Sequence, residues 1–107
     1  AAFFEVVVAK AKRGDFVYFD PPYVPLSITS SFTSYTSHGF AAGQQVRLRD
    51  TALKLKKRGV RVLVSNSSAA FVRELYSDDF EMIEVAALRL VNSKGAARGS
   101  VAELLMK

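Results

Sequence analysis

The chain has 107 residues, of which 50% are hydrophobic and 23% are charged, a composition typical of one soluble globular domain and not of a disordered segment. Fifteen basic and ten acidic side chains give a formal net charge of +5, which is compatible with a polyanionic partner but does not require one. The lack of cysteine excludes disulfides, a thiolate nucleophile and a cysteine-based zinc site, and no apolar stretch approaches the roughly 20 residues that span a bilayer. We therefore expect a cytoplasmic protein without a membrane partner.

The N-terminal part of the chain contains a helix pattern and then a strand pattern. Apolar residues at helical spacing predict a helix over residues 3–12 that Gly14 ends, although the valine triplet at 6–8 leaves a strand open. The four apolar residues Phe16–Phe19 predict a strand that is covered on both faces in a parallel sheet. Residues 24–43 are rich in Ser and Thr and predict a loop whose length indicates a functional or mobile segment.

The rest of the chain alternates between helices and strands. The patterns predict a helix over 44–58, a strand over 60–64, a helix over 69–76, and strands over 80–90 and 100–106. Gly59 would end the first of these helices, and Ser68 would cap the second. Alternating elements favour a parallel sheet, and the last two strands, joined without a helix, must be antiparallel.

The residues Asp20, Pro21, Pro22 and Tyr23 follow directly after the strand predicted at 16–19. Two successive prolines end a central strand, since each lacks the ladder donor and has a fixed φ. An acid and an aromatic ring are then displayed at the carboxyl end of a buried strand, where ligands bind in open α/β sheets. These four residues are the candidate functional site.

This segment resembles the Dam family of DNA adenine-N6 methyltransferases, in which an Asp-Pro-Pro-Tyr motif lies in the active site. The similarity begins at Gly14 and continues in the family's order and spacing over nearly the whole chain. The matching residues are Pro25-Leu26-Ser27, Phe32-Thr33-Ser34-Tyr35, Gly39-Phe40, Gln44-Gln45, Leu48, Val64-Ser65-Asn66, Arg98 and the run from Val101 to Leu105.

The resemblance implies a fold and a reaction. The fold would be α/β: the second half of a Rossmann-like S-adenosylmethionine-dependent methyltransferase sheet, with parallel strands flanked by helices and a C-terminal antiparallel hairpin whose last strand is inserted between its neighbours. The reaction would be methyl transfer from S-adenosylmethionine to a flipped adenine in double-stranded DNA, in bacterial or phage cytoplasm.

The resemblance also implies roles for individual residues. Phe19 and Asp20 would contact the methyl donor, and Asp20 would lie between the cofactor and the adenine. The residues expected to contact DNA are Ser27, Phe32, Tyr35, Lys94 and Arg98.

The chemistry of an exocyclic amine explains why this motif would be catalytic. The amine is a poor nucleophile because its lone pair is delocalised into the base. The Asp20 carboxylate and the Pro21 carbonyl can accept the amine hydrogens and return that lone pair to the direction of attack. Tyr23 can stack on the base, which is worth roughly 1–3 kcal/mol and offsets part of the cost of flipping. Asp20, Pro21, Pro22 and Tyr23 are therefore the predicted catalytic residues, and no metal is expected.

The sequence departs from the family in one respect. The family's Phe-x-Gly-x-Gly cofactor motif is absent, and no Gly-x-Gly occurs in the chain. We therefore expect residues 1–107 to be a partial catalytic domain, the C-terminal part of a longer enzyme, and inactive by itself; the alternative is a remnant without a methyl-donor pocket. Without the preceding half, the strand Phe16–Phe19 would be an unpaired apolar edge, which predicts self-association or burial by a rearranged N-terminal segment.

The sequence leaves several alternatives open. The chain could be a non-catalytic basic module that binds nucleic acid or serves assembly, or an amino-methyltransferase acting on cytosine N4 or an RNA base. Pro22 and Pro25 also form a Pro-x-x-Pro ligand pattern, His38 is expected on a surface loop, and Asn66 could either shape the site or cap a helix. The basic residues of the second helix indicate either a solvated face or phosphate contacts; they are Arg47, Arg49, Lys54, Lys56, Lys57 and Arg58.

Overall fold

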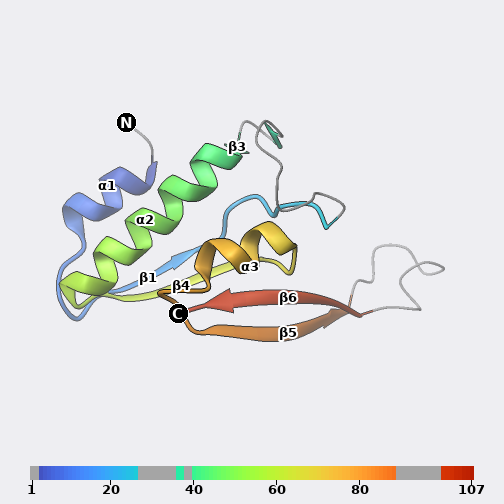
Figure 1. The fold of residues 1–107 in the computed structure, drawn as a ribbon. Coiled ribbons are helices and arrows are strands. Elements are labelled where there is room, and N and C mark those ends of the chain that lie inside the picture. The colour runs from blue at the N-terminus through green and yellow to red at the C-terminus, as the bar shows by residue number, and fades with distance from the viewer. Residues whose placement is uncertain (1–2, 27–35, 38–39, 89–99) are drawn as a thin grey trace.

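The computed structural model describes residues 3–26, 36–37, 40–88 and 100–107. Helices and strands alternate along most of this chain, as the sequence pattern predicted (Figure 1). The elements are α1 (Phe3–Lys10), β1 (Phe16–Phe19), β2 (Thr36–Ser37), β3 (Phe40–Ala41), α2 (Ala42–Arg58), β4 (Arg61–Ser67), α3 (Ala70–Tyr76), β5 (Met82–Leu88) and β6 (Ser100–Met106).

Four of the strands form one mixed sheet in the order β1-β4-β6-β5. β1 and β4 are parallel, with Phe19 opposite Val64, whereas β6 runs antiparallel to both β4 and β5. The short strands β2 and β3 pair with each other in a separate antiparallel ladder. The predicted antiparallel pairing of the last two strands is confirmed, and β6 lies between β4 and β5, as the resemblance implied (Figure 1).

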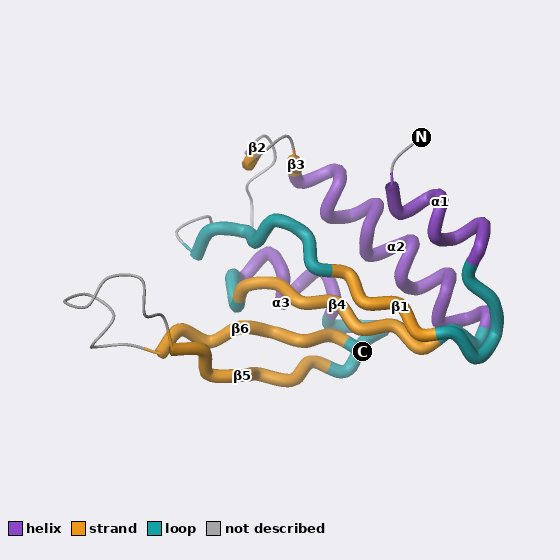
Figure 2. The backbone as a smooth tube through the Cα atoms, turned by 180° about the vertical axis from the view of Figure 1, so that it is seen from behind, coloured by secondary structure: helices purple, strands orange, loops and turns teal. Residues whose placement is uncertain are grey.

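The hydrophobic core lies between one face of this sheet and the helices. Figures 1 and 2 show α1 and α2 along the same side of the sheet, with the C-terminal hairpin of β5 and β6 extending beyond them. Burial of these apolar side chains is the main force that holds the layers together. The buried side chains include Phe19, Val62, Val64, Leu104 and Met106 from the strands, Leu48, Ala52 and Leu55 from α2, and Val72 and Tyr76 from α3.

The opposite face of the sheet is open within the described part of the chain. The strand register places Phe16 and Tyr18 of β1 on this face, together with Ile83 and Val85 of β5. Phe16 is 62% exposed and Tyr18 is 49% exposed. The prediction that this strand is covered on both faces is therefore wrong, because the described helices pack on one side only.

β1 is also an edge of the sheet. Among the described strands it is hydrogen-bonded to β4 alone. The predicted unpaired apolar edge is thus confirmed. α1 packs against α2, and Phe16 and Tyr18 of β1 stay exposed.

Two glycine turns set the start of the parallel strands. Gly59 has a φ of 98°, its N–H donates to the Lys56 carbonyl at 3.0 Å, and the N–H of Val60 donates to the Leu55 carbonyl at 3.0 Å, which is the Schellman arrangement expected of a helix-ending glycine. Gly14, with a φ of 92°, donates its N–H to the Gly59 carbonyl at 3.1 Å. The two turns therefore meet, so β1 and β4 begin side by side.

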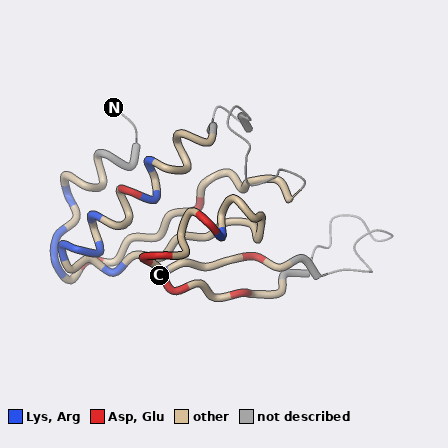
Figure 3. The backbone as a smooth tube through the Cα atoms, in the orientation of Figure 1, with Lys and Arg blue, Asp and Glu red and all other residues tan. Residues whose placement is uncertain are grey.

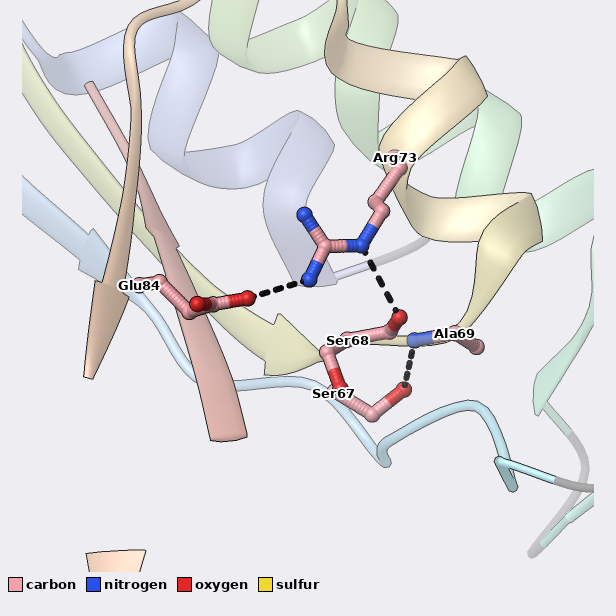
Figure 4. A network of polar contacts seen from close by, with 5 residues as sticks. All are labelled: Ser67, Ser68, Ala69, Arg73 and Glu84. Carbon is pink, nitrogen blue, oxygen red and sulfur yellow. Dashed lines mark hydrogen bonds and ion pairs between the residues drawn. The ribbon is translucent and has the colours of Figure 1, made fainter. Parts of the chain in front are cut away.

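The beginning of α3 differs from the prediction. Its N-cap residue is Ala69, without a side-chain cap hydrogen bond, so the prediction that Ser68 caps this helix is wrong. The hydroxyl of Ser67 instead accepts from the Ala69 N–H at 3.3 Å. Arg73 secures the junction, since its Nε donates to the Ser68 carbonyl at 3.2 Å and its Nη2 pairs with Glu84 of β5 (Figure 4).

Candidate active site at the end of the first strand

The four residues from Asp20 to Tyr23 follow β1 directly, so the prolines end the strand as predicted. Because β1 and β4 are parallel and Phe19 lies opposite Val64, the last residues of β4 lie beside the motif. β4 continues to Ser67, beyond the predicted end at Val64, and its final residues are the polar and buried Ser65, Asn66 and Ser67. These polar residues at the end of a strand supply most of the hydrogen bonds of the site.

The Asp20 carboxylate is held on one side and open on the other. The buried Ser65 hydroxyl donates to Asp20 Oδ1 at 2.8 Å, and the Tyr18 hydroxyl donates to Ser65 Oγ at 3.1 Å. Asp20 itself is exposed. Its second carboxylate oxygen, like the Pro21 carbonyl, has no hydrogen-bond partner in the part of the chain that the structure describes. Two acceptors are thus available for one amine.

Tyr23 is half-buried, and its hydroxyl donates to Glu103 Oε1 of β6 at 3.4 Å. Burial raises the pKa of the Tyr23 phenol; the Ser65 hydroxyl opposes this effect, and the carboxylates of Glu103 and Asp20 add to it. The phenol is therefore neutral at physiological pH. A hollow of about 150 Å³ lies beside the ring and is lined by Tyr23, Val24, Pro25, Leu26, Ser67, Ala102 and Glu103.

The backbone after the prolines is fixed by two buried amides. Gln45 Nε2 of α2 donates to the Pro22 carbonyl at 3.0 Å, and the Val24 N–H donates to Asn66 Oδ1 at 3.0 Å. Of the two interpretations of Asn66, the structure supports hydrogen bonding that shapes the site, since the helix cap is Ala69.

Sequence reasoning assigned no role at this site to four of its residues: Gln45, Ser65 and Glu103, which it matched to the family, and Ser67, which it did not name. Gln45 carried a signal, because it stands on the helix face of Leu48 and Ala52, where a polar residue needs a buried partner.

Of the remaining predicted site residues, the structure describes only Phe19. Ser27, Phe32, Tyr35, Lys94, Arg98 and His38 lie outside the described residues, so their predicted positions stay predictions. Phe19, predicted to contact a cofactor, has its side chain in the core at 5% exposure, which leaves its backbone for that contact.

Many of the described basic residues lie near the end of α2 and the beginning of β1 and β4 (Figure 3), whereas Asp20 follows the other end of β1. Several of the basic residues of α2 serve the fold. Arg58 Nη1 donates to the carbonyls of Val8 and Ala11, and Lys56 lies 4.3 Å from the centre of the Phe80 ring. This arrangement fits a solvated, structural role better than phosphate contacts at the site.

Two negative findings concern the described residues. No helix among them is long and apolar enough to cross a membrane. Nor do they contain a group of three or more His, Asp or Glu side chains that could hold a metal ion.

Comparisons with known proteins agree with the motif. The family description "D12 class N6 adenine-specific DNA methyltransferase" matches residues 1–91. A Type II methyltransferase, M1.LlaDCHI, of Lactococcus lactis subsp. cremoris is 50% identical over 103 residues, covering 96% of this chain and 36% of the relative. A DNA adenine methylase of Vibrio cholerae is 43% identical over 98 residues, covering 91% of the chain and 35% of the relative. A DNA N-6-adenine-methyltransferase of Escherichia phage P1 is 40% identical over 103 residues, covering 95% of the chain and 14% of the relative. The chain thus spans about a third or less of the length of these relatives.

Proposed function

Since the chain belongs to the D12 class N6 adenine-specific DNA methyltransferases, we propose that it forms the part of such an enzyme that receives the target adenine. The observation that carries this proposal is the pair of open acceptors at the end of β1, the second Asp20 oxygen and the Pro21 carbonyl, next to the Tyr23 ring. An exocyclic amine has two hydrogens, and two fixed acceptors are what its orientation needs.

The chain's own residues would act on the base in two ways. Asp20 and Pro21 accept the amine hydrogens and so direct the nitrogen lone pair away from the ring, in a geometry prepared by the Ser65 hydrogen bond. Tyr23 stacks on the flipped adenine as a neutral ring, because its raised pKa keeps the phenol protonated. Pro22 stiffens the turn between them.

The methyl donor proposed for this site is S-adenosylmethionine, which supplies an electrophilic methyl group when it is bound. The residues present fit part of the site for this methyl donor. Asp20 is exposed at the end of the edge strand β1, and the backbone of Phe19 directly precedes Asp20. The glycine motif that the family uses for the cofactor is not in this sequence. We therefore propose that the mixed sheet is one part of a Rossmann-like methyltransferase sheet, with the rest of the cofactor site contributed from beyond these residues.

The alternatives receive less support. The matched family is adenine-specific and acts on DNA, which disfavours cytosine N4 or an RNA base as the substrate. A purely nucleic-acid-binding module is disfavoured because the matched family is one of methyltransferases and because many basic residues of the described part lie near the end of α2, away from the motif (Figure 3). We also propose a cytoplasmic location, since the relatives named above come from bacteria and a phage. We further propose that the isolated chain self-associates through the edge strand β1.

The test of this function is Asp20→Ala in the intact methyltransferase that contains these residues. We expect methyl transfer to adenine in DNA to fall about 10²–10³-fold, the usual effect of removing one preorganised electrostatic group. Asp50→Ala is the matched control, because Asp50 is an exposed carboxylate on α2 that pairs with Arg49. Normal transfer by Asp20→Ala would show that Asp20 does not hold the amine.

A further inference from the structure

Two buried amide side chains, Gln45 of α2 and Asn66 of β4, form a continuous hydrogen-bonded link around Tyr23. Gln45 is 2% exposed and Asn66 is fully buried. Gln45 Nε2 donates to the Pro22 carbonyl at 3.0 Å, Asn66 Nδ2 donates to Gln45 Oε1 at 3.1 Å, and Asn66 Oδ1 accepts from the Val24 N–H at 3.0 Å. The link starts just before Tyr23 and closes just after it.

This link fixes the direction in which the Tyr23 side chain leaves the backbone. The Pro22 carbonyl belongs to the peptide unit before Tyr23, and the Val24 N–H belongs to the unit after it. Each peptide unit is planar, so holding both planes holds the φ and ψ angles of Tyr23. The Ser67 hydroxyl donates to the Val24 carbonyl and so holds the next peptide unit along the chain.

The packing of the fold alone does not require amides at these positions. Position 45 lies on the helix face of Leu48 and Ala52, where an apolar residue would pack without the desolvation cost of an amide. The bonds of Asn66 go to Val24, to its neighbour Ser67 and to Gln45. None of them occupies the Asp20 carboxylate or the Pro21 carbonyl.

We infer that Gln45 and Asn66 are positioning residues that hold the Tyr23 ring ready to stack on the target base. This inference rests on the proposed function, because it assigns a purpose to the geometry of the same site. The pair leaves both amine acceptors open while it immobilises the ring. The ring is then ordered before the base binds, so its ordering does not reduce the free energy of binding.

The test is Gln45→Met in the intact methyltransferase, combined with Tyr23→Ala in a double-mutant cycle. Met keeps the approximate length of Gln and removes both hydrogen bonds. We expect the single-turnover rate of methylation to fall roughly tenfold in the Tyr23 background and less than about twofold in the Tyr23→Ala background, because interacting residues are not additive. A 2-aminopurine at the target position should fluoresce more brightly with Gln45→Met, since the flipped base is stacked less.

Controls separate positioning from loss of fold. Leu48→Met changes a buried residue of the same helix and leaves the hydrogen bonds of the link intact, so it should leave both the rate and the fluorescence unchanged. If Gln45→Met does not fold, Asn66→Asp repeats the cycle, since Asp keeps the acceptor for Val24 and removes the donor to Gln45.

The outcomes also separate this inference from the function on which it rests. Equal losses from Gln45→Met with and without the Tyr23 ring would overturn the positioning role. No loss from Gln45→Met while Tyr23→Ala is impaired would overturn it as well. A normal rate in Tyr23→Ala would instead contradict the proposed role of the ring in the function itself.

Discussion

The hydroxyl of Tyr76 is a buried polar group without a partner, and its removal should stabilise the protein. The side chain is fully buried, and its Oη has no hydrogen-bond partner among the described residues. The ring itself packs edge-on against Phe80, with 5.0 Å between the ring centroids. Tyr76→Phe keeps this packing and deletes only the hydroxyl.

The expected magnitude follows from two opposing contributions. An unsatisfied buried hydroxyl costs about 1–3 kcal/mol. The void left by one oxygen, on the order of 10–15 Å³, costs about 0.3 kcal/mol at roughly 24 cal/mol per Å³. We expect Tyr76→Phe to raise the free energy of unfolding by about 1 kcal/mol, which corresponds to roughly 4 °C in the melting temperature of a domain of this size.

The pH dependence gives this prediction a second, independent readout. Burial raises the pKa of the Tyr76 phenol above its ordinary value, so the folded state keeps its proton at pH values where the unfolded phenol, with a pKa of about 10, has lost it. The unfolded state then binds fewer protons, and stability falls as the pH rises above about 10. Tyr76→Phe removes this contribution, so its advantage over the wild type should widen at alkaline pH.

Urea unfolding of both proteins between pH 7 and pH 11 measures the effect. Tyr18→Phe is the matched control: it makes the same chemical change at a half-exposed ring whose hydroxyl donates to Ser65, and it should be neutral or slightly destabilising. A Tyr76→Phe protein less stable than the wild type at pH 7 would refute the reasoning and indicate that the hydroxyl is satisfied.

Two further predictions concern the turns and the sheet edge. Gly59→Ala should destabilise the protein by about 1–2 kcal/mol in thermal melts, because φ is +98° and the new Cβ would lie 2.9 Å from Arg13 Cγ. Gly43→Ala is the control: a Cβ at Gly43 would have no atom within 4 Å, so this variant should be neutral or slightly stabilising. Equal melting temperatures for the two variants would contradict this. The second prediction is that the molar mass of the isolated chain, measured by size-exclusion chromatography with light scattering, rises with protein concentration. Phe16→Lys should lower this molar mass, because it places a charge on the exposed edge strand. A monodisperse wild-type monomer at all concentrations would remove the self-association proposal.

Local patterns were sufficient to predict most of the elements. Phe16–Phe19 and Ser100–Met106 are strands with the predicted bounds, and α2 ends at the predicted glycine. These features depend on neighbours in the sequence: an apolar run, a helical period, a residue that accepts a positive φ. The predicted cap at Ser68 is wrong because it depends on where the preceding strand ends, which neighbours in the sequence do not decide. β4 continues through the polar residues to Ser67, and Ala69 is the residue that begins α3.

The sequence by itself determined where the candidate site lies, since an acid, two prolines and an aromatic ring after an apolar strand end that strand and resemble a family motif. Only the tertiary structure decided how they are held. Ser65, Asn66 and Gln45 reach the motif from elements more than 20 residues away in the chain. Ser65 and Asn66 do so because β4 is parallel to β1 and extends past the residue opposite Phe19, whereas Gln45 comes from α2. Tertiary structure also decided that one face of β1 is open, because coverage of a strand depends on where helices pack and not on the strand's own residues.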